Sequence, residues 1–187
     1  MMKITVICPG NLKEAYLKSA AAEYLKRLSR YCDITVFEPS PERLPEKPSD
    51  AAIAAALEKE ADAILRLVPP RSYVTALCVE GKRLTSEAFA ENLKELSALG
   101  SPLTFIIGSS YGLSPRVKQR ADLRLSLSDM TFPHQLFRIM LLEQLYRAFK
   151  INEGGSYHKY SDFKTNSVRN NPQDLADGIF NFIMVGL

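Results

Sequence analysis

Short apolar runs alternate with longer amphipathic stretches along this chain, and this alternation limits the possible folds more than any other feature. Five runs have the length of β-strands, at residues 3–8, 33–38, 73–79, 103–107 and 123–127. The third and fourth runs are almost continuously apolar, which is typical of strands covered on both faces. Strand–helix–strand repetition predicts an α/β fold with a parallel sheet, right-handed crossovers and ligands bound at the carboxyl ends of the strands.

The stretches between these runs have helical spacing and start or stop signals. We expect helices at residues 12–30, 50–67, 86–99 and 134–150. The last of these carries apolar side chains over more than one stripe of its surface. It is therefore either a deeply buried central helix or a helix that also meets a second subunit.

Composition narrows the class of protein. The chain has 187 residues, 46% of them hydrophobic, and its 24 Lys and Arg against 21 Asp and Glu give a net charge of +3, which fits an anionic partner without requiring one. Cys8, Cys32 and Cys78 lie far apart in apolar runs, so we expect free thiols in a reducing, cytoplasmic compartment. No run approaches the roughly 20 apolar residues of a membrane span, and only two histidines occur. We therefore expect neither a membrane partner nor a metal.

Three loops at strand ends contain residue types that can hold a small ligand. Gly108-Ser109-Ser110-Tyr111-Gly112 follows the run 103–107, and Ser114 with Pro115 then starts a helix. Residues 127–134 follow the last run, and Glu80-Gly81-Lys82 follows the third. Two glycines after a buried strand permit either close backbone approach to a ligand or a tight turn without one. Because the ends of parallel strands meet at one edge, three such loops favour a shared binding pocket.

Four strings carry a resemblance to a known family: ALCVEGK, FIIGSSYGLSP, LSLSDMTFPHQLFRIMLLEQLYRAFKI and YHKY. In this order they closely resemble the RlmH family, the pseudouridine-N3 methyltransferases of large-subunit ribosomal RNA, which are members of the SPOUT superfamily. The resemblance implies a SPOUT-type α/β fold, with a parallel sheet, helices on both faces and a C-terminal trefoil knot. It also implies a homodimer and S-adenosylmethionine as the methyl donor, bound in the knot.

The resemblance further implies which residues bind the cofactor. They are Leu77, Gly108, Leu127, Ser128, Asp129, Met130, Thr131 and Phe132. The chemistry of these residues agrees, because backbone groups at Gly108 and along the Leu127 loop can bind the edge of an adenine. Leu77, Met130 and Phe132 supply apolar walls.

Transfer of a methyl group to N3 of a pseudouridine requires alignment of the two reactants and removal of an imide proton. His158 in SYHKY is the candidate for accepting that proton or for positioning the substrate, and the alternative is a plain surface histidine. Tyr157 beside it either stacks on the target base or packs on the protein. Arg147 either contacts RNA or the partner subunit, or is an exposed helix charge.

The substrate implied by the resemblance is 23S ribosomal RNA. The modest net charge favours an RNA shaped by the large subunit or the whole ribosome over naked RNA. Two other functions remain open: a SPOUT methyltransferase of another RNA, and a non-catalytic nucleotide-binding or ribosome-assembly protein. Because the resemblance ends near Tyr160, we expect a SPOUT domain over residues 1–160 and a C-terminal extension of unknown role over residues 161–187.

Overall fold

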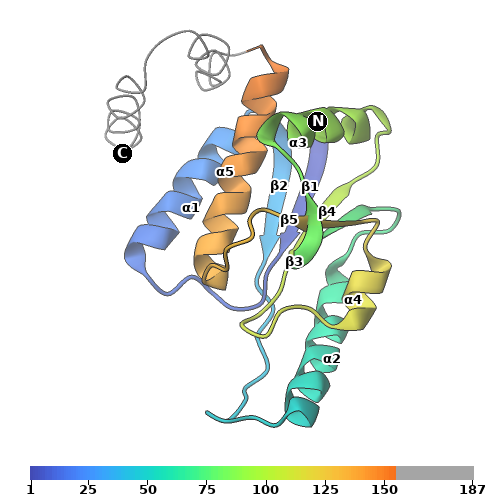
Figure 1. Cartoon of the computed structure of the whole chain (residues 1–187). Coiled ribbons are helices and arrows are strands. Elements are labelled where there is room, and N and C mark those ends of the chain that lie inside the picture. The colour runs from blue at the N-terminus through green and yellow to red at the C-terminus, as the bar shows by residue number, and fades with distance from the viewer. Residues whose placement is uncertain (155–187) are drawn as a thin grey trace, which may run out of the picture.

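Strands and helices alternate along the chain as the sequence predicts (Figure 1). The computed structural model describes residues 1–154. The strands are β1 (Met2–Ile7), β2 (Cys32–Phe37), β3 (Tyr73–Arg83), β4 (Leu103–Ile107) and β5 (Leu123–Ser126). The helices are α1 (Ala15–Leu28), α2 (Asp50–Leu67), α3 (Ser86–Ala98), α4 (Pro115–Arg120) and α5 (His134–Asn152). Each apolar run predicted to be a strand is one.

The strands form one sheet in the order β2-β1-β4-β3-β5, and every neighbouring pair is parallel. This confirms the predicted parallel sheet. The central strand β4 is buried along its whole length, as its continuous apolar run predicts. The carboxyl ends of β1, β4 and β3 lie side by side, so the loops that leave them meet at one edge of the sheet.

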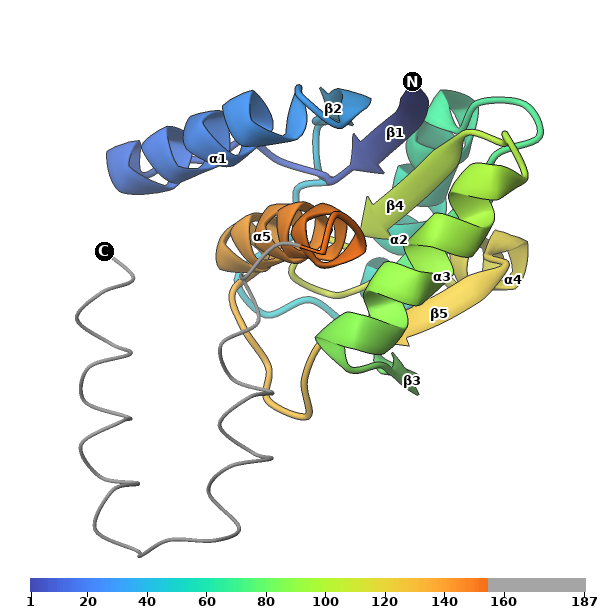
Figure 2. The same cartoon turned by 90° about the horizontal axis from the view of Figure 1, so that it is seen from above.

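Helices cover both faces of the sheet (Figure 2). On one face, α1, α3 and α5 share a hydrophobic cluster with Phe105 and Ile107 of β4. On the other face, α2 and α4 share a second cluster with Ile106. The division follows from the period of two in a strand, which sends successive side chains of β4 to opposite faces.

Helix α5 lies between α1 and α3 and contacts both (Figure 2). Leu141, Leu142 and Leu145 are fully buried, whereas Leu136 is 39% exposed. Half-buried aromatic residues, among them Phe137, pack against the edge of the same cluster. One side of this helix is therefore buried within the described part of the chain, and its half-buried side is compatible with either of the two alternatives from the sequence.

Strand β3 continues past its predicted end and runs to Arg83. Its pairing with β5 shifts register, because Leu125 lies opposite Leu77 and again opposite Lys82. A Cβ atom on Gly81 would lie 2.5 Å from the carbonyl carbon of Leu125, so only glycine fits this close passage. Glu80-Gly81-Lys82 is thus part of an irregular strand rather than the loop that the sequence predicts.

Side-chain caps fix the starts of three helices. Ser49, Thr85 and Ser114 each accept a hydrogen bond from the backbone N–H three residues later, at 3.2, 3.2 and 3.3 Å. The predicted start signal at Ser114 is confirmed, whereas α1 has no such cap and begins at Ala15. None of the helices within residues 1–154 has the length and apolar character needed to cross a membrane.

Candidate functional site

The strands that carry the expected cofactor residues end next to one another. Leu77 of β3 lies opposite Ile107 of β4 and opposite Leu125 of β5. Gly108 directly follows β4, and Leu127 directly follows β5. The structure therefore brings Leu77, Gly108 and the start of the 127–132 loop to one region of the sheet edge, as expected for loops that share a pocket.

Gly108 opens a tight turn that closes on itself. Gly112 donates a backbone hydrogen bond to the Ser109 carbonyl at 3.0 Å, and its φ of +86° lies in the left-handed region that favours glycine. A Cβ atom on Gly108 would lie 2.3 Å from the carbonyl oxygen of Gly112. The tight turn is therefore present, and contacts within the protein are enough to explain why both positions are glycine.

The 127–132 loop is held by a few polar contacts, and three of its six residues, Asp129, Met130 and Thr131, are exposed. Ser126 Oγ donates to the Ser128 carbonyl at 2.9 Å, and Ser128 Oγ accepts from the Met130 N–H at 3.0 Å. The Asp129 carboxylate pairs with Arg83 at the end of β3. The Met130 side chain is 72% exposed, and Thr131 is also exposed while Phe132 is half-buried.

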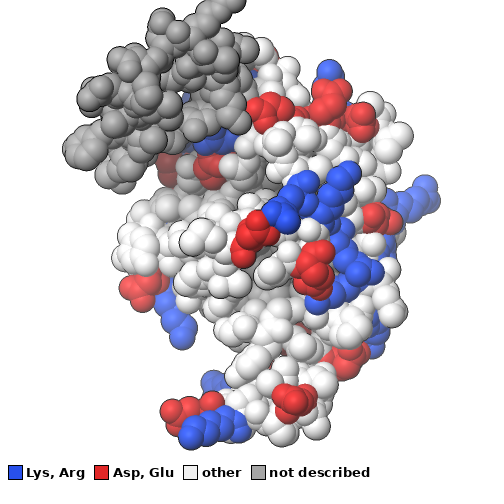
Figure 3. All heavy atoms as spheres, in the orientation of Figure 1, with Lys and Arg blue, Asp and Glu red and all other residues white. Residues whose placement is uncertain are grey.

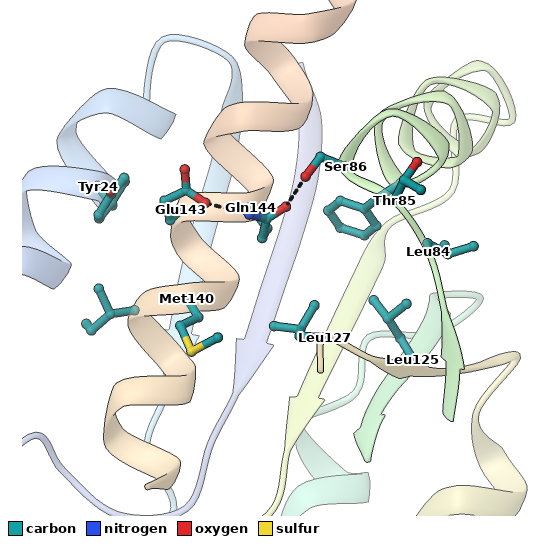
Figure 4. A pocket seen from close by; sticks show the side chains of 11 residues that line it. Tyr24, Leu84, Thr85, Ser86, Leu125, Leu127, Met140, Glu143 and Gln144 are labelled. Carbon is teal, nitrogen blue, oxygen red and sulfur yellow. Dashed lines mark hydrogen bonds between the residues drawn. The ribbon is translucent and has the colours of Figure 1, made fainter. Parts of the chain in front are cut away.

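A cavity of about 400 Å³ opens beside this loop, between α1, α3, α5 and the end of β5 (Figure 4). Of the expected cofactor residues, Leu127 alone lines it. One wall is a polar network: Ser86 Oγ donates to Gln144 Oε1 at 3.0 Å, and Gln144 Nε2 donates to Glu143 Oε2 at 2.7 Å. This network was not predicted from the sequence. Its signal is weak, because neighbouring polar residues on a helix are usually solvated.

Arg147 extends that network. Its Nε donates to Glu143 Oε1 at 2.9 Å, and both side chains are half-buried. Arg147 is therefore a half-buried charge paired with Glu143 on α5, and not an exposed helix charge. Tyr157 and His158, the other two residues expected near the substrate, lie outside the described residues.

A second cavity, of about 200 Å³, lies against the Gly108–Gly112 turn. Its lining comes from the segment after β2, from the first turns of α2 and from the turn itself: Pro41, Glu42, Leu44, Ile53, Ala56, Leu57, Glu60, Ser109, Ser110 and Tyr111. The Pro-rich, charged sequence of residues 38–49 is typical of an exposed connection and does not predict a cavity beneath it. Glu60, which is buried in this cavity, was also missed.

His134 lies between the 127–132 loop and the Gly108–Gly112 turn. It is the first residue of α5, and its Nδ1 lies 3.5 Å from Ser110 Oγ in the turn. Burial lowers the pKa of its imidazole below the ordinary value, and the positive charges of Arg138 and Lys13 lower it further. The neutral imidazole is therefore favoured near neutral pH.

Arg138, one turn along α5, is buried and joins the ends of β1 and β2. Its guanidinium pairs with Glu38 and donates from Nη2 to the Gly10 carbonyl at 2.6 Å. A buried charge requires such partners, because an unpaired one costs several kcal/mol, on the order of 3–5. Arg138 and Arg147 thus lie on different sides of α5, because nine residues of an α-helix correspond to a rotation of roughly 180°.

Comparison with known proteins identifies the family. The family model described as "Predicted SPOUT methyltransferase" matches residues 2–158. The chain is 48% identical over 159 residues to a protein of Streptococcus equi subsp. zooepidemicus and 51% identical over 159 residues to one of Carboxydothermus hydrogenoformans, both named Ribosomal RNA large subunit methyltransferase H. Each match covers 84% of this chain and 100% of the relative.

A protein of Methanococcus maripaludis named Putative ribosomal RNA large subunit methyltransferase H is 48% identical over the same length. Among solved structures, a probable methylase family protein from Haemophilus influenzae Rd KW20 matches with a TM-score of 0.49 at 12% identity, over 100% of this chain and 89% of that one. The family match and the identities over the whole length of the curated relatives show that this chain belongs to the RlmH family of SPOUT methyltransferases.

Proposed function

We propose that this chain transfers a methyl group from S-adenosylmethionine to N3 of a pseudouridine in 23S ribosomal RNA. The observation that carries the proposal is the match at 48–51% identity over the full length of relatives named Ribosomal RNA large subunit methyltransferase H. The fold supports it, because three strand ends from the matching region meet at one edge.

The cofactor residues of the proposal are Leu77, Gly108, Leu127, Ser128, Asp129, Met130, Thr131 and Phe132. The fit is supported by the exposed side chain of Met130 and by the loop backbone, in which the Ser128 carbonyl accepts from Ser126 Oγ and the Met130 N–H donates to Ser128 Oγ. Free backbone amides and carbonyls can bind an adenine edge, while Leu77 and Phe132 supply apolar surface. When bound, S-adenosylmethionine supplies a methyl group on a positively charged sulfur.

The residues of the chain have two tasks in this reaction. The first is alignment, because holding the nitrogen in line with the methyl carbon supplies several kcal/mol, on the order of 7–11 in the best cases. An apolar wall assists by excluding water from a step in which a positive charge fades. The second is removal of the N3 proton as the new nitrogen–carbon bond forms and the carbon–sulfur bond breaks, with its electron pair passing to sulfur.

Residues near the end of the region that matches the family model carry out the second task, removal of the proton. In this proposal His158 accepts the proton or positions the base, Tyr157 stacks on it, and Arg147 contacts RNA or the partner subunit. Glu143, which lines the larger cavity, accepts a hydrogen bond from Arg147 Nε and so fixes the position of the Arg147 side chain. Tyr157 and His158 precede the expected C-terminal extension, so the proposal divides the chain into a methyltransferase domain at residues 1–160 and an extension at residues 161–187.

The assembly proposed is a cytoplasmic homodimer with a trefoil knot in its C-terminal part. The knot is supported by the course of the chain, which leaves β5 at one side of the sheet and returns through α5 between α1 and α3 (Figure 2). The dimer is supported by an aromatic surface formed by α1, α5 and the residue before β2, where Tyr24 and Tyr31 approach Tyr146 with ring centroids 6.4 and 6.1 Å apart. Partly exposed aromatic residues of this kind are enriched at interfaces between proteins.

The proposed substrate is the RNA within the large subunit or the whole ribosome. Lys and Arg side chains gather on one face of the protein (Figure 3). Several cations of the described residues are paired, such as Arg83 with Asp129 and Lys118 with Glu80. Paired cations neutralise few phosphates, and the net charge is only +3. We expect ribosomes to be methylated faster than free 23S RNA, and equal rates would contradict this part of the proposal.

The deciding experiment maps methyl groups by mass spectrometry on ribosomes from cells with and without the protein. We expect one pseudouridine of 23S RNA to lose a methyl group in the cells that lack it, and the purified full chain to restore it with S-adenosylmethionine. A methyl group lost from another RNA would favour a different SPOUT methyltransferase. No binding of millimolar S-adenosylmethionine in calorimetry would favour a non-catalytic assembly protein.

A matched pair of variants tests the cofactor loop. Met130 and Leu99 side chains are both 72% exposed, so truncation of either should leave stability unchanged. Met130→Ala should weaken S-adenosylmethionine binding by about tenfold, because an apolar side chain that becomes covered contributes about 1.5 kcal/mol. Leu99→Ala should bind as the wild type does, and equal affinities for the two variants would remove Met130 from the site.

A further inference from the structure

The smaller cavity contains a buried carboxylate that the protein satisfies only in part. Glu60 of α2 is 6% exposed. Its Oε1 accepts a hydrogen bond from the Glu42 N–H at 3.0 Å, but its Oε2 is buried without a hydrogen-bond partner among residues 1–154. An acceptor left in this state is unfavourable, so the cavity lacks a donor.

The charged side chains nearby do not supply that donor. Lys59, next to Glu60 in the sequence, pairs with the Glu42 carboxylate at 3.6 Å. Arg116 of α4 reaches α2 but pairs with Glu58 and Asp62. The missing donor is therefore best supplied by a group that binds in the cavity.

The cavity lies next to the region proposed for the cofactor. Ser109, Ser110 and Tyr111 form one wall, and they directly follow Gly108. The opposite wall includes Pro41, which is within 3.8 Å of the Cβ position of Gly10, and that position is 4.0 Å from His134 Nε2. His134 follows the 127–132 loop by two residues. A base held in this cavity therefore contacts the turn that begins at Gly108, one of the residues that the proposed function assigns to the cofactor.

Pseudouridine carries a donor that uridine lacks. Its sugar is attached through carbon, which leaves N1 as a free N–H, whereas N1 of uridine is bonded to the ribose. Resting on the proposed function, we propose that this cavity receives the target base and that Glu60 Oε2 accepts a hydrogen bond from its N1–H. The Tyr111 ring, 46% exposed at the wall, stacks on the base, as aromatic side chains do with unpaired RNA bases.

This arrangement makes Glu60 the residue that distinguishes pseudouridine from uridine. A site built to bind an N–H rejects an analogue without it, because the buried acceptor then stays unpaired. We expect the wild-type protein to methylate pseudouridine at least about tenfold faster than uridine in kcat/KM. The N3–H is present in both bases, so this difference does not come from the reacting nitrogen.

The test compares ribosomes that have either pseudouridine or uridine at the target position, prepared from cells with and without the enzyme that makes pseudouridine there. Three full-length proteins are compared: the wild type, Glu60→Gln and Glu58→Gln. The amide of Glu60→Gln keeps one oxygen for the Glu42 N–H and replaces the other by a donor. Glu58 is the matched control, since it is two residues away on α2 and its side chain is 48% exposed.

We expect Glu60→Gln to lose most of the preference for pseudouridine while it binds S-adenosylmethionine as the wild type does, and Glu58→Gln to retain both properties. An unchanged preference in Glu60→Gln would overturn the proposal. A loss of cofactor affinity in that variant would also overturn it, because the cavity would then belong to the cofactor. If the wild type methylates neither ribosome, the proposed function itself is wrong.

A second variant keeps the test valid if Glu60→Gln does not fold. Tyr111→Ala removes a half-exposed ring, so the fold should tolerate it. We expect the KM for ribosomes to rise about tenfold, from the loss of one stacked base, with unchanged affinity for S-adenosylmethionine. An unchanged KM would show that the base does not bind in this cavity.

Discussion

Gly108→Ala is the substitution whose effect follows most directly from the structure. The added Cβ would lie 2.3 Å from the carbonyl oxygen, 2.4 Å from the carbonyl carbon and 2.9 Å from the Cα of Gly112. All three atoms belong to the backbone, so no side chain can rotate away. The turn must open or β4 must shift, and both the turn and the fully buried end of β4 are under strain in the variant.

The expected cost can be set against a matched glycine. Overpacking by a methyl group usually costs about 1–3 kcal/mol, and the rigid neighbours here place Gly108→Ala near 3. For a protein of this size that lowers the melting temperature by about 6–12 °C. Gly100 has a φ of +69° and no atom within 4 Å of a Cβ, so Gly100→Ala should cost only about 1 kcal/mol from its left-handed backbone.

The assay is thermal unfolding of both variants, followed by circular dichroism under identical conditions. Calorimetry with S-adenosylmethionine on the folded proteins then separates stability from binding, and we expect weaker binding for Gly108→Ala alone. Equal melting temperatures for Gly108→Ala and Gly100→Ala would refute the reasoning. They would mean that the turn relaxes around a methyl group at little cost.

Three further outcomes are expected. Leu142→Ala should lower the free energy of unfolding by about 2–5 kcal/mol in urea denaturation, because its side chain is fully buried, whereas Leu136→Ala should cost under about 1 kcal/mol. Ser114→Ala should cost about 1–2 kcal/mol, since it removes the cap of α4, and a cost below 0.5 in the same assay would show that the cap is dispensable. The pKa of His134 is lowered by burial and by Arg138, so its NMR titration midpoint should lie below about 6.5. Protonation then favours the unfolded chain, and His134 should reduce stability as the pH falls below 6.5, an effect absent in His134→Gln.

Much of the fold could be predicted from the sequence, because its strands and helix starts are determined by residues that are close together in the chain. The run at 103–107 is apolar at every position, and only a strand covered on both faces buries all of it. Ser49 and Ser114 mark helix starts because a side-chain oxygen caps the N–H three residues on. The irregular end of β3 could not be predicted in this way, since the requirement for glycine at position 81 comes from the backbone of β5, which lies far along the chain.

The candidate site was predictable in part for the same reason. The glycines at 108 and 112 indicate a tight turn after a strand, and the turn is present. Glu60 was missed because it stands among other acidic residues, Glu58 and Asp62, which are exposed. A signal did exist: Glu60 lies four residues from Ala56 and from Ile64, so the helical period places it on the buried face of α2.

A small set of polar contacts connects the Glu60 cavity to the start of α5, and therefore to the 127–132 loop. The segment after β2 is hydrogen-bonded to the segment after β1, with Gly10 N–H donating to the Pro39 carbonyl at 2.9 Å. Arg138 of α5 holds both segments through Glu38 and the Gly10 carbonyl. Pro41, a wall of the Glu60 cavity, is therefore anchored to the first turns of the helix that the 127–132 loop leads into. Because the buried Arg138 guanidinium depends on these partners, we expect a shift of that loop that displaces the start of α5 to displace this wall as well.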